Sequence, residues 1–169
     1  MKKSDNYPIY IPFMRSILNL SLFGSGLLLL FWVHIYIALA YLFYCLLAAI
    51  ILLPRFRCTV CAHYGTLCST GFGKVAAFLF KKNKQLPFTY GLWYNLFLLP
   101  IAIIPVISSL VLIINGSYSG LSCYFVMFYM SLFLIFFEHG YFGCLRCKEL
   151  RYCPANFIVK RFGLPKCIK

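Results

Sequence analysis

Two Cys-x-x-Cys motifs, 86 residues apart in a chain of 169, are the features of this sequence most suggestive of chemistry. The first is formed by Cys58 and Cys61, and the second by Cys144 and Cys147. Two thiols at this spacing can bind one ion when the backbone makes a tight turn, and two such pairs complete a tetrahedral four-cysteine site of the structural zinc type. We therefore expect these four cysteines to bind zinc.

Three more residues beside the motifs are further candidate ligands: His63, Cys68 and Cys153. Nine cysteines in 169 residues would produce roughly half of one Cys-x-x-Cys pair by chance, and two pairs are present. Basic side chains favour the thiolate form of neighbouring cysteines and offset the negative charge of a thiolate–metal centre. Those nearest the motifs are Arg57, Arg146, Lys148 and Arg151.

Two redox interpretations stay open as alternatives. An iron–sulfur cluster would use Cys-x-x-Cys pairs followed by a later Cys153-Pro154, but the spacings match no standard cluster motif. A quinone-linked thiol oxidoreductase would also use two cysteine pairs. The quinone-linked disulfide-forming enzymes and the vitamin K epoxide reductase type are similar in architecture only, and they keep their cysteines on the oxidising face. Disulfides are disfavoured on the reducing side of the membrane, so we favour zinc and a non-enzymatic role.

The composition indicates an integral membrane protein. Hydrophobic residues make up 63% of the chain, aromatic residues 20% and charged residues only 11%, whereas a typical soluble domain is roughly 25% charged. A soluble fold of this size could not hide so much apolar surface. With only three carboxylates in the chain, chemistry based on paired carboxylates is not expected.

The apolar runs predict an all-α, four-helix transmembrane bundle, since a spanning helix needs roughly 20 apolar residues. The run 17–53 carries no formal charge and is long enough for two helices that turn near residues 31–34. The segment 115–120 is a turn between two further apolar stretches. The predicted spans lie at about 13–30, 35–53, 92–114 and 121–138.

A three-span alternative makes residues 27–53 one tilted helix preceded by a surface helix. The cations favour four spans, because that topology places all 16 Lys and Arg residues on one face, whereas three spans place only 13 there. Positive residues stay in the cytoplasm, so both termini are expected to be cytoplasmic. No cleavable signal peptide is expected, because Arg15 interrupts the first apolar region.

The cysteine motifs fall in a loop at 54–86 and a tail at 139–169, which lie on the same face in either topology. We expect them to form a Cys-rich cytoplasmic cap in which the two motifs meet. The 86-residue offset also suggests two tandem hairpin repeats related by an axis normal to the membrane. Outside the motifs the match is poor, and a simple four-helix bundle remains the alternative to a repeat.

The formal net charge of +13 suggests anionic lipid headgroups as partners, because the cations flank apolar runs. Nucleic acid is not expected as a partner, whereas a cytoplasmic or membrane protein partner stays possible. The segment 74–84 predicts a short helix in the headgroup layer, with its apolar residues on one face.

Other features carry weaker expectations. Glu138-His139 closes the last span, and this acid could support a metal site from the outer shell. Pro100 and Pro105 should kink the third span, with neighbouring groups satisfying the freed carbonyls. We expect Cys45 and Cys123 to serve only in packing.

Overall fold

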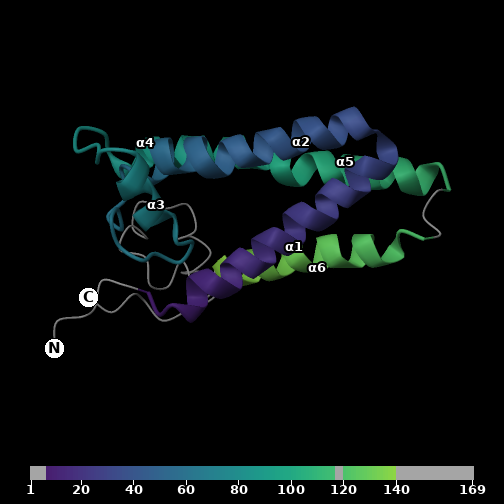
Figure 1. Ribbon diagram of the computed structural model, residues 1–169, viewed down its shortest axis with the longest axis horizontal. Coiled ribbons are helices and arrows are strands. Elements are labelled where there is room, and N and C mark those ends of the chain that lie inside the picture. Colours follow the sequence, from purple (N-terminus) through teal and green to yellow (C-terminus); the bar gives the residue numbers. More distant parts are fainter. Residues whose placement is uncertain (1–6, 117–119, 140–169) are drawn as a thin grey trace.

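In a computed structural model, residues 7–116 and 120–139 are described, and this part of the chain is helical with no strands (Figure 1). Three helices are long and apolar enough to cross a membrane: Tyr10–Val33, Ile35–Cys58 and Thr89–Ile114. The last apolar helix, Ser122–Glu138, is shorter. The elements in order are α1 (Tyr10–Val33), α2 (Ile35–Leu47), the π-helix η1 (Ala48–Cys58), α3 (Phe72–Leu79), α4 (Phe88–Trp93), the 3-10 helix η2 (Tyr94–Leu98), α5 (Leu99–Ile114) and α6 (Ser122–Glu138).

The long helices run back and forth between two ends of the molecule (Figure 1). One end holds the start of α1, the end of η1, α3, α4 and the end of α6, and the other end holds the turn between α1 and α2, the end of α5 and the start of α6. Helix α1 crosses the others and contacts α2, α5 and α6. Helix α3 lies against η1 at the first end. The cysteine-bearing loop between η1 and α3 is therefore at the end where α6 finishes.

The turn between α1 and α2 consists of one residue, His34, in an extended conformation with φ −167° and ψ 132°. Its Nδ1 accepts a hydrogen bond from the backbone N–H of Tyr36 at 3.4 Å, which caps the start of α2. The break falls inside segment 31–34, where the apolar pattern predicts a turn. The first apolar run therefore forms two antiparallel helices rather than one long helix.

The second helix continues beyond Leu53, where the sequence pattern places its end. Pro54 lies inside η1, and proline in an α-helix removes one hydrogen bond and clashes with the preceding turn. The wider turn of a π-helix accommodates this defect, so the helix passes Pro54 and ends at Cys58. Pro100 lies in the first turn of α5, where a missing N–H is tolerated.

Pro105 lies inside α5 and leaves the carbonyl of Ile101 without its helical donor. The hydroxyl of Tyr41, on α2, donates a hydrogen bond to that carbonyl at 2.9 Å. A neighbouring helix thus satisfies the carbonyl that proline frees, as expected for a proline in a membrane helix. Tyr41 belongs to a buried stripe with helical spacing that runs from α2 into η1 and is formed by Ala38, Tyr41, Cys45 and Ala48. The packing role expected for Cys45 is therefore observed.

Gly26 on α1 makes room for this contact. A Cβ atom at Gly26 would lie 3.1 Å from Cγ of Pro105, 3.2 Å from the Tyr41 hydroxyl and 3.4 Å from a ring carbon of Phe128. A Cβ atom at Gly24, two residues earlier in the same helix, would meet nothing within 4 Å. The glycine at position 26 thus allows α1, α2, α5 and α6 to approach closely, as small residues do in membrane helix packing.

Gly26→Ala is expected to be less stable than Gly24→Ala. Alanine raises helix propensity at both positions by up to about 1 kcal/mol, but at Gly26 overpacking costs about 1–3 kcal/mol. Thermal unfolding in detergent should therefore show Gly24→Ala at or above wild type and Gly26→Ala below Gly24→Ala. Equal unfolding temperatures for the two variants would show that the α1 interface has more room than the contacts indicate.

Large apolar side chains face outward along the long helices, including Phe13, Leu20, Phe43 and Phe136, each more than half exposed. Soluble monomers rarely expose so large an apolar surface. Cys123, expected to pack, is instead exposed near the start of α6. Exposed aromatic residues mark both ends of this surface, with Trp32 and Tyr36 at one end and Tyr90 and Trp93 at the other, a distribution typical of membrane interfaces.

Candidate functional site

The first Cys-x-x-Cys motif lies where η1 ends and the chain turns back. Cys58 is the last residue of η1, and the backbone N–H of Cys61 donates to the Cys58 carbonyl at 3.2 Å. A second bond, from the Tyr64 N–H to the Cys61 carbonyl at 3.2 Å, continues the turn. The first motif therefore lies in a tight, hydrogen-bonded turn. Cys58 and Cys61 are both partly exposed.

Cys68 lies in the same neighbourhood, because Cys58 is within electrostatic range of both Cys68 and Cys61. The Cys68 sulfur accepts a hydrogen bond from the backbone N–H of Gly73 at 3.4 Å and contacts the Thr70 hydroxyl at 3.3 Å. Cys58 and Cys68 are free thiols, so the structure gathers sulfur at the basic end of the molecule.

His63, a further candidate ligand, is buried in the loop, with 6% of its surface exposed. Its ring packs edge-on against Tyr7, with centroids 5.5 Å apart and planes at 71°, and its carbonyl accepts a bond from the Thr66 hydroxyl at 2.9 Å. In residues 7–116 and 120–139, no three His, Cys, Asp or Glu side chains form a group that could hold a metal. The first motif alone is therefore an incomplete site.

The second motif and Cys153 lie outside the described residues, as does all of the tail beyond His139. Their predicted ligand roles stay predictions. The structure does describe the point from which this tail departs. The charge of Arg57 acts on His139 at the end of α6, and Arg57 precedes Cys58 in the chain. The tail therefore leaves the described structure near the first motif.

A buried ion pair at this end of the molecule was not anticipated from the sequence. Nη1 of Arg15, on α1, donates a hydrogen bond to Oε2 of Glu138, the last residue of α6, at 2.5 Å. Nη1 of Arg15 also lies 3.0 Å from Nδ1 of His139. Arg15 is 8% exposed and Glu138 is 6% exposed. The pair joins two helices through residues 123 positions apart.

The pair lies at one end of an α1–α6 seam that also contains a polar contact. Further along, the Ser131 hydroxyl donates to the Ser21 hydroxyl at 2.8 Å, and Phe128 packs near Gly26. Oε1 of Glu138 and Nε of Arg15 are buried without a hydrogen-bond partner among the described residues. The ion pair is therefore the main interaction that offsets the cost of removing these two charges from water.

One signal in the sequence pointed toward this pair. Arg15 is the only charge close to the first apolar run on its N-terminal side, and Glu138 is the only carboxylate near any span. Charged residues inside a membrane usually pair with one another, so the two charges were natural partners. The predicted support of a metal site by Glu138 involves Cys144, which lies outside the described residues, so that role stays a prediction. Among the described residues, Glu138 pairs with Arg15.

The pKa of His139 falls from its ordinary 6.5 to about 4. The main cause is removal of the ring from water, and the guanidinium groups of Arg15 and Arg57 add repulsion of the imidazolium. Folded protein therefore keeps His139 neutral at pH 7, so that Nδ1 can accept a hydrogen bond from Arg15. Glu138 is the remaining charged group beside the ring.

Stability should consequently fall as the pH drops from 6.5 toward 4, because the unfolded chain binds a proton on this histidine and the folded chain does not. Part of the side chain stays exposed, so solvent screening keeps the effect at or below about 1 kcal/mol. Thermal unfolding of wild type and His139→Asn at pH 7 and pH 5 measures it. The asparagine variant should lose part of the pH dependence, and an identical dependence would contradict the assignment.

Comparison of the chain with known protein families, with curated proteins and with solved structures found no match.

Proposed function

We propose that this chain is a multi-pass membrane anchor with four spans, whose cytoplasmic face carries a thiolate zinc site that joins the loop to the tail. Cys58 and Cys61 would supply one pair of ligands, and Cys144 and Cys147 the other. The zinc would be structural, and the basic face that it stabilises would receive a cytoplasmic or membrane protein partner. In this proposal the protein is an adaptor rather than an enzyme.

The distribution of charge supports the four-span topology. All Lys and Arg residues of the described part lie at the end that holds η1, α3 and the start of α1, and the described residues of the two turns at the opposite end carry none. Residues Tyr10 to Trp32 of α1 extend about 33 Å at the rise of an α-helix, which matches the ~30 Å core of a bilayer. The positive-inside rule then assigns the basic end to the cytoplasm.

The single observation that carries the zinc proposal is the position of the end of α6. His139 lies within range of the charge of Arg57, which is adjacent to Cys58. Cys144 follows His139 by five positions, and a fully extended chain of that length reaches at most about 18 Å. The second motif can therefore reach the first. The tight turn at Cys58 and Cys61 is compatible with a metal ion bound tetrahedrally by four thiolates.

Metal analysis of the purified full-length protein tests the identity of the site. We expect one zinc per chain, retained through purification in detergent. Iron with visible absorption would favour the cluster alternative. Absence of both metals, with cysteines that run as disulfides on a non-reducing gel, would favour a thiol oxidoreductase and reject zinc.

An impermeant thiol reagent applied to intact cells tests the orientation. Single-cysteine variants that keep Cys58 should be labelled only after the membrane is permeabilised. A matched variant that keeps Cys123, which is exposed near the start of α6 at the opposite end, should react first from outside. Labelling of Cys58 in intact cells would invert the proposed topology.

A further inference from the structure

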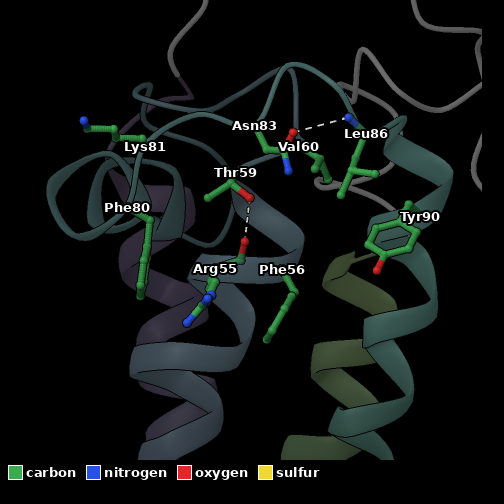
Figure 2. A pocket seen from close by; sticks show the side chains of 9 residues that line it. All are labelled: Arg55, Phe56, Thr59, Val60, Phe80, Lys81, Asn83, Leu86 and Tyr90. Atoms are coloured by element: carbon green, nitrogen blue, oxygen red, sulfur yellow. Dashed lines mark hydrogen bonds between the residues drawn. The ribbon is translucent and has the colours of Figure 1, made fainter.

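A cavity of about 540 Å³ lies between η1 and α4 and beneath the loop that joins α3 to α4 (Figure 2). Its walls combine apolar and basic side chains. Phe56 and Val60 line it from the η1 side, and Leu86 and Tyr90 from the other side. The cavity adjoins the cysteine turn, because Thr59 and Val60 line it, but no cysteine does.

The polar groups of the cavity are hydrogen-bond donors and cations. Arg55 lies over the ring of Phe56, with its guanidinium carbon 5.6 Å from the ring centroid, a cation–π contact that orients it. Lys81 lies at the rim. Oδ1 of Asn83 accepts backbone N–H groups of Gln85 and Leu86 at 3.0 and 3.3 Å, so its Nδ2 donors face the cavity (Figure 2).

Anions would meet little electrostatic competition at this place. Glu138 is the only carboxylate among the described residues, and it is already paired with Arg15. Two further cations, Lys82 and Lys84, extend the basic surface along the same loop. Lys82 is held over the ring of Tyr64, 5.9 Å from its centroid. The surroundings therefore favour a phosphate group over a neutral or cationic one.

The level of the cavity favours a lipid as the source of that phosphate. It lies where two candidate membrane helices, Ile35–Cys58 and Thr89–Ile114, reach the basic end. Trp93, 73% exposed, follows Tyr90 by one turn and marks the interface. Phe78 on α3, 88% exposed, is a second apolar group at this end. A soluble phosphate would leave the apolar wall without a partner.

We propose that this cavity binds the headgroup of an anionic phospholipid, with the phosphate beside the Asn83 amide, the cations Arg55 and Lys81 attracting it from the margin of the cavity, and the acyl chains along Leu86 and Tyr90. The cavity shares Thr59 and Val60 with the cysteine turn, but its proposed lipid contacts involve no cysteine and so do not require zinc.

Trp93 is a natural reporter, since the chain has only two tryptophans and Trp32 lies at the opposite end. The full-length Trp32→Phe protein would be reconstituted in phosphatidylcholine vesicles that contain brominated phosphatidic acid, or brominated phosphatidylcholine as the neutral comparison. Quenching of Trp93 measures which lipid occupies the cavity. We expect clear preference for the anionic lipid, and a loss of about five-fold in that preference for Arg55→Gln or Lys81→Gln.

Lys74→Gln is the matched control, because Lys74 is exposed on α3 and does not line the cavity; it should keep the preference. Equal quenching by both lipids, or an equal loss in Lys74→Gln, would overturn the proposal in favour of diffuse attraction to the surface. Millimolar glycerol 3-phosphate should not relieve the quenching. Relief would identify a soluble phosphate site and reject the lipid. Circular dichroism checks that the variants, altered at exposed residues, keep their helices.

Discussion

Glu138→Gln is expected to lower the free energy of unfolding in detergent by about 3–5 kcal/mol, because it leaves the buried charge of Arg15 without its partner. Arg15→Met should lower the free energy of unfolding by a similar amount, because it leaves the buried charge of Glu138 without its partner. Replacing both, with Arg15→Met and Glu138→Leu, should recover much of the loss, since apolar residues of similar volume often substitute for a buried pair without penalty. Denaturant unfolding of the four proteins gives the coupling free energy directly.

Lys84→Met serves as the matched control, because Lys84 is an exposed cation at the same end of the molecule and its loss should stay within about 0.5 kcal/mol. A small effect of Glu138→Gln, close to that of the control, would show that the pair is solvated. A double variant with the summed cost of the two single variants would show that Arg15 and Glu138 act independently.

Gly73→Ala should disrupt the cysteine-bearing loop. A Cβ atom at position 73 would lie 2.4 Å from the carbonyl oxygen of His63 and 2.6 Å from that of Thr66. These are backbone atoms, so relief requires the loop to move, at a cost of about 1–3 kcal/mol or more. The Gly73 N–H bond to the Cys68 sulfur would be lost with it.

Thermal unfolding and the rate of Cys68 labelling by a thiol reagent measure this effect together. We expect a lower unfolding temperature and faster labelling, whereas Gly24→Ala, at an open position, should cause neither. Unchanged labelling of Cys68 would mean that the loop absorbs the added methyl group without opening.

The positions of the helices were largely predictable from the sequence, because a helix that spans a membrane needs a long apolar run and turns interrupt these runs. The turn at His34 and the helix Ser122–Glu138 follow the pattern to within a few residues. The continuation of the second helix through Pro54 was not predictable, since it depends on a π-helical geometry that accommodates a residue disfavoured in α-helices. A hydrogen bond from a neighbouring group to the carbonyl freed by Pro105 was expected, but the sequence did not identify Tyr41 as the donor.

The candidate site was predictable only in part. The tight turn at Cys58 and Cys61 is a local structure that the spacing could indicate, whereas the ligand role of these cysteines stays a prediction. The burial of His63 against Tyr7 depends on how the loop folds back on the start of the chain, which local spacing does not encode. The Arg15–Glu138 pair joins residues 123 positions apart, so it follows from the crossing of α1 and α6 rather than from any motif.

The most direct test of the central proposal is the zinc content of variants in which either cysteine pair is removed. Cys58→Ser/Cys61→Ser and Cys144→Ser/Cys147→Ser should each lose the metal, because two thiolates cannot complete a tetrahedral site. Cys45→Ser/Cys123→Ser, which removes one packed and one exposed cysteine outside the motifs, should keep one zinc per chain. Retention of zinc after removal of either pair, or absence of zinc from the wild type, would contradict a shared site that joins the loop to the tail.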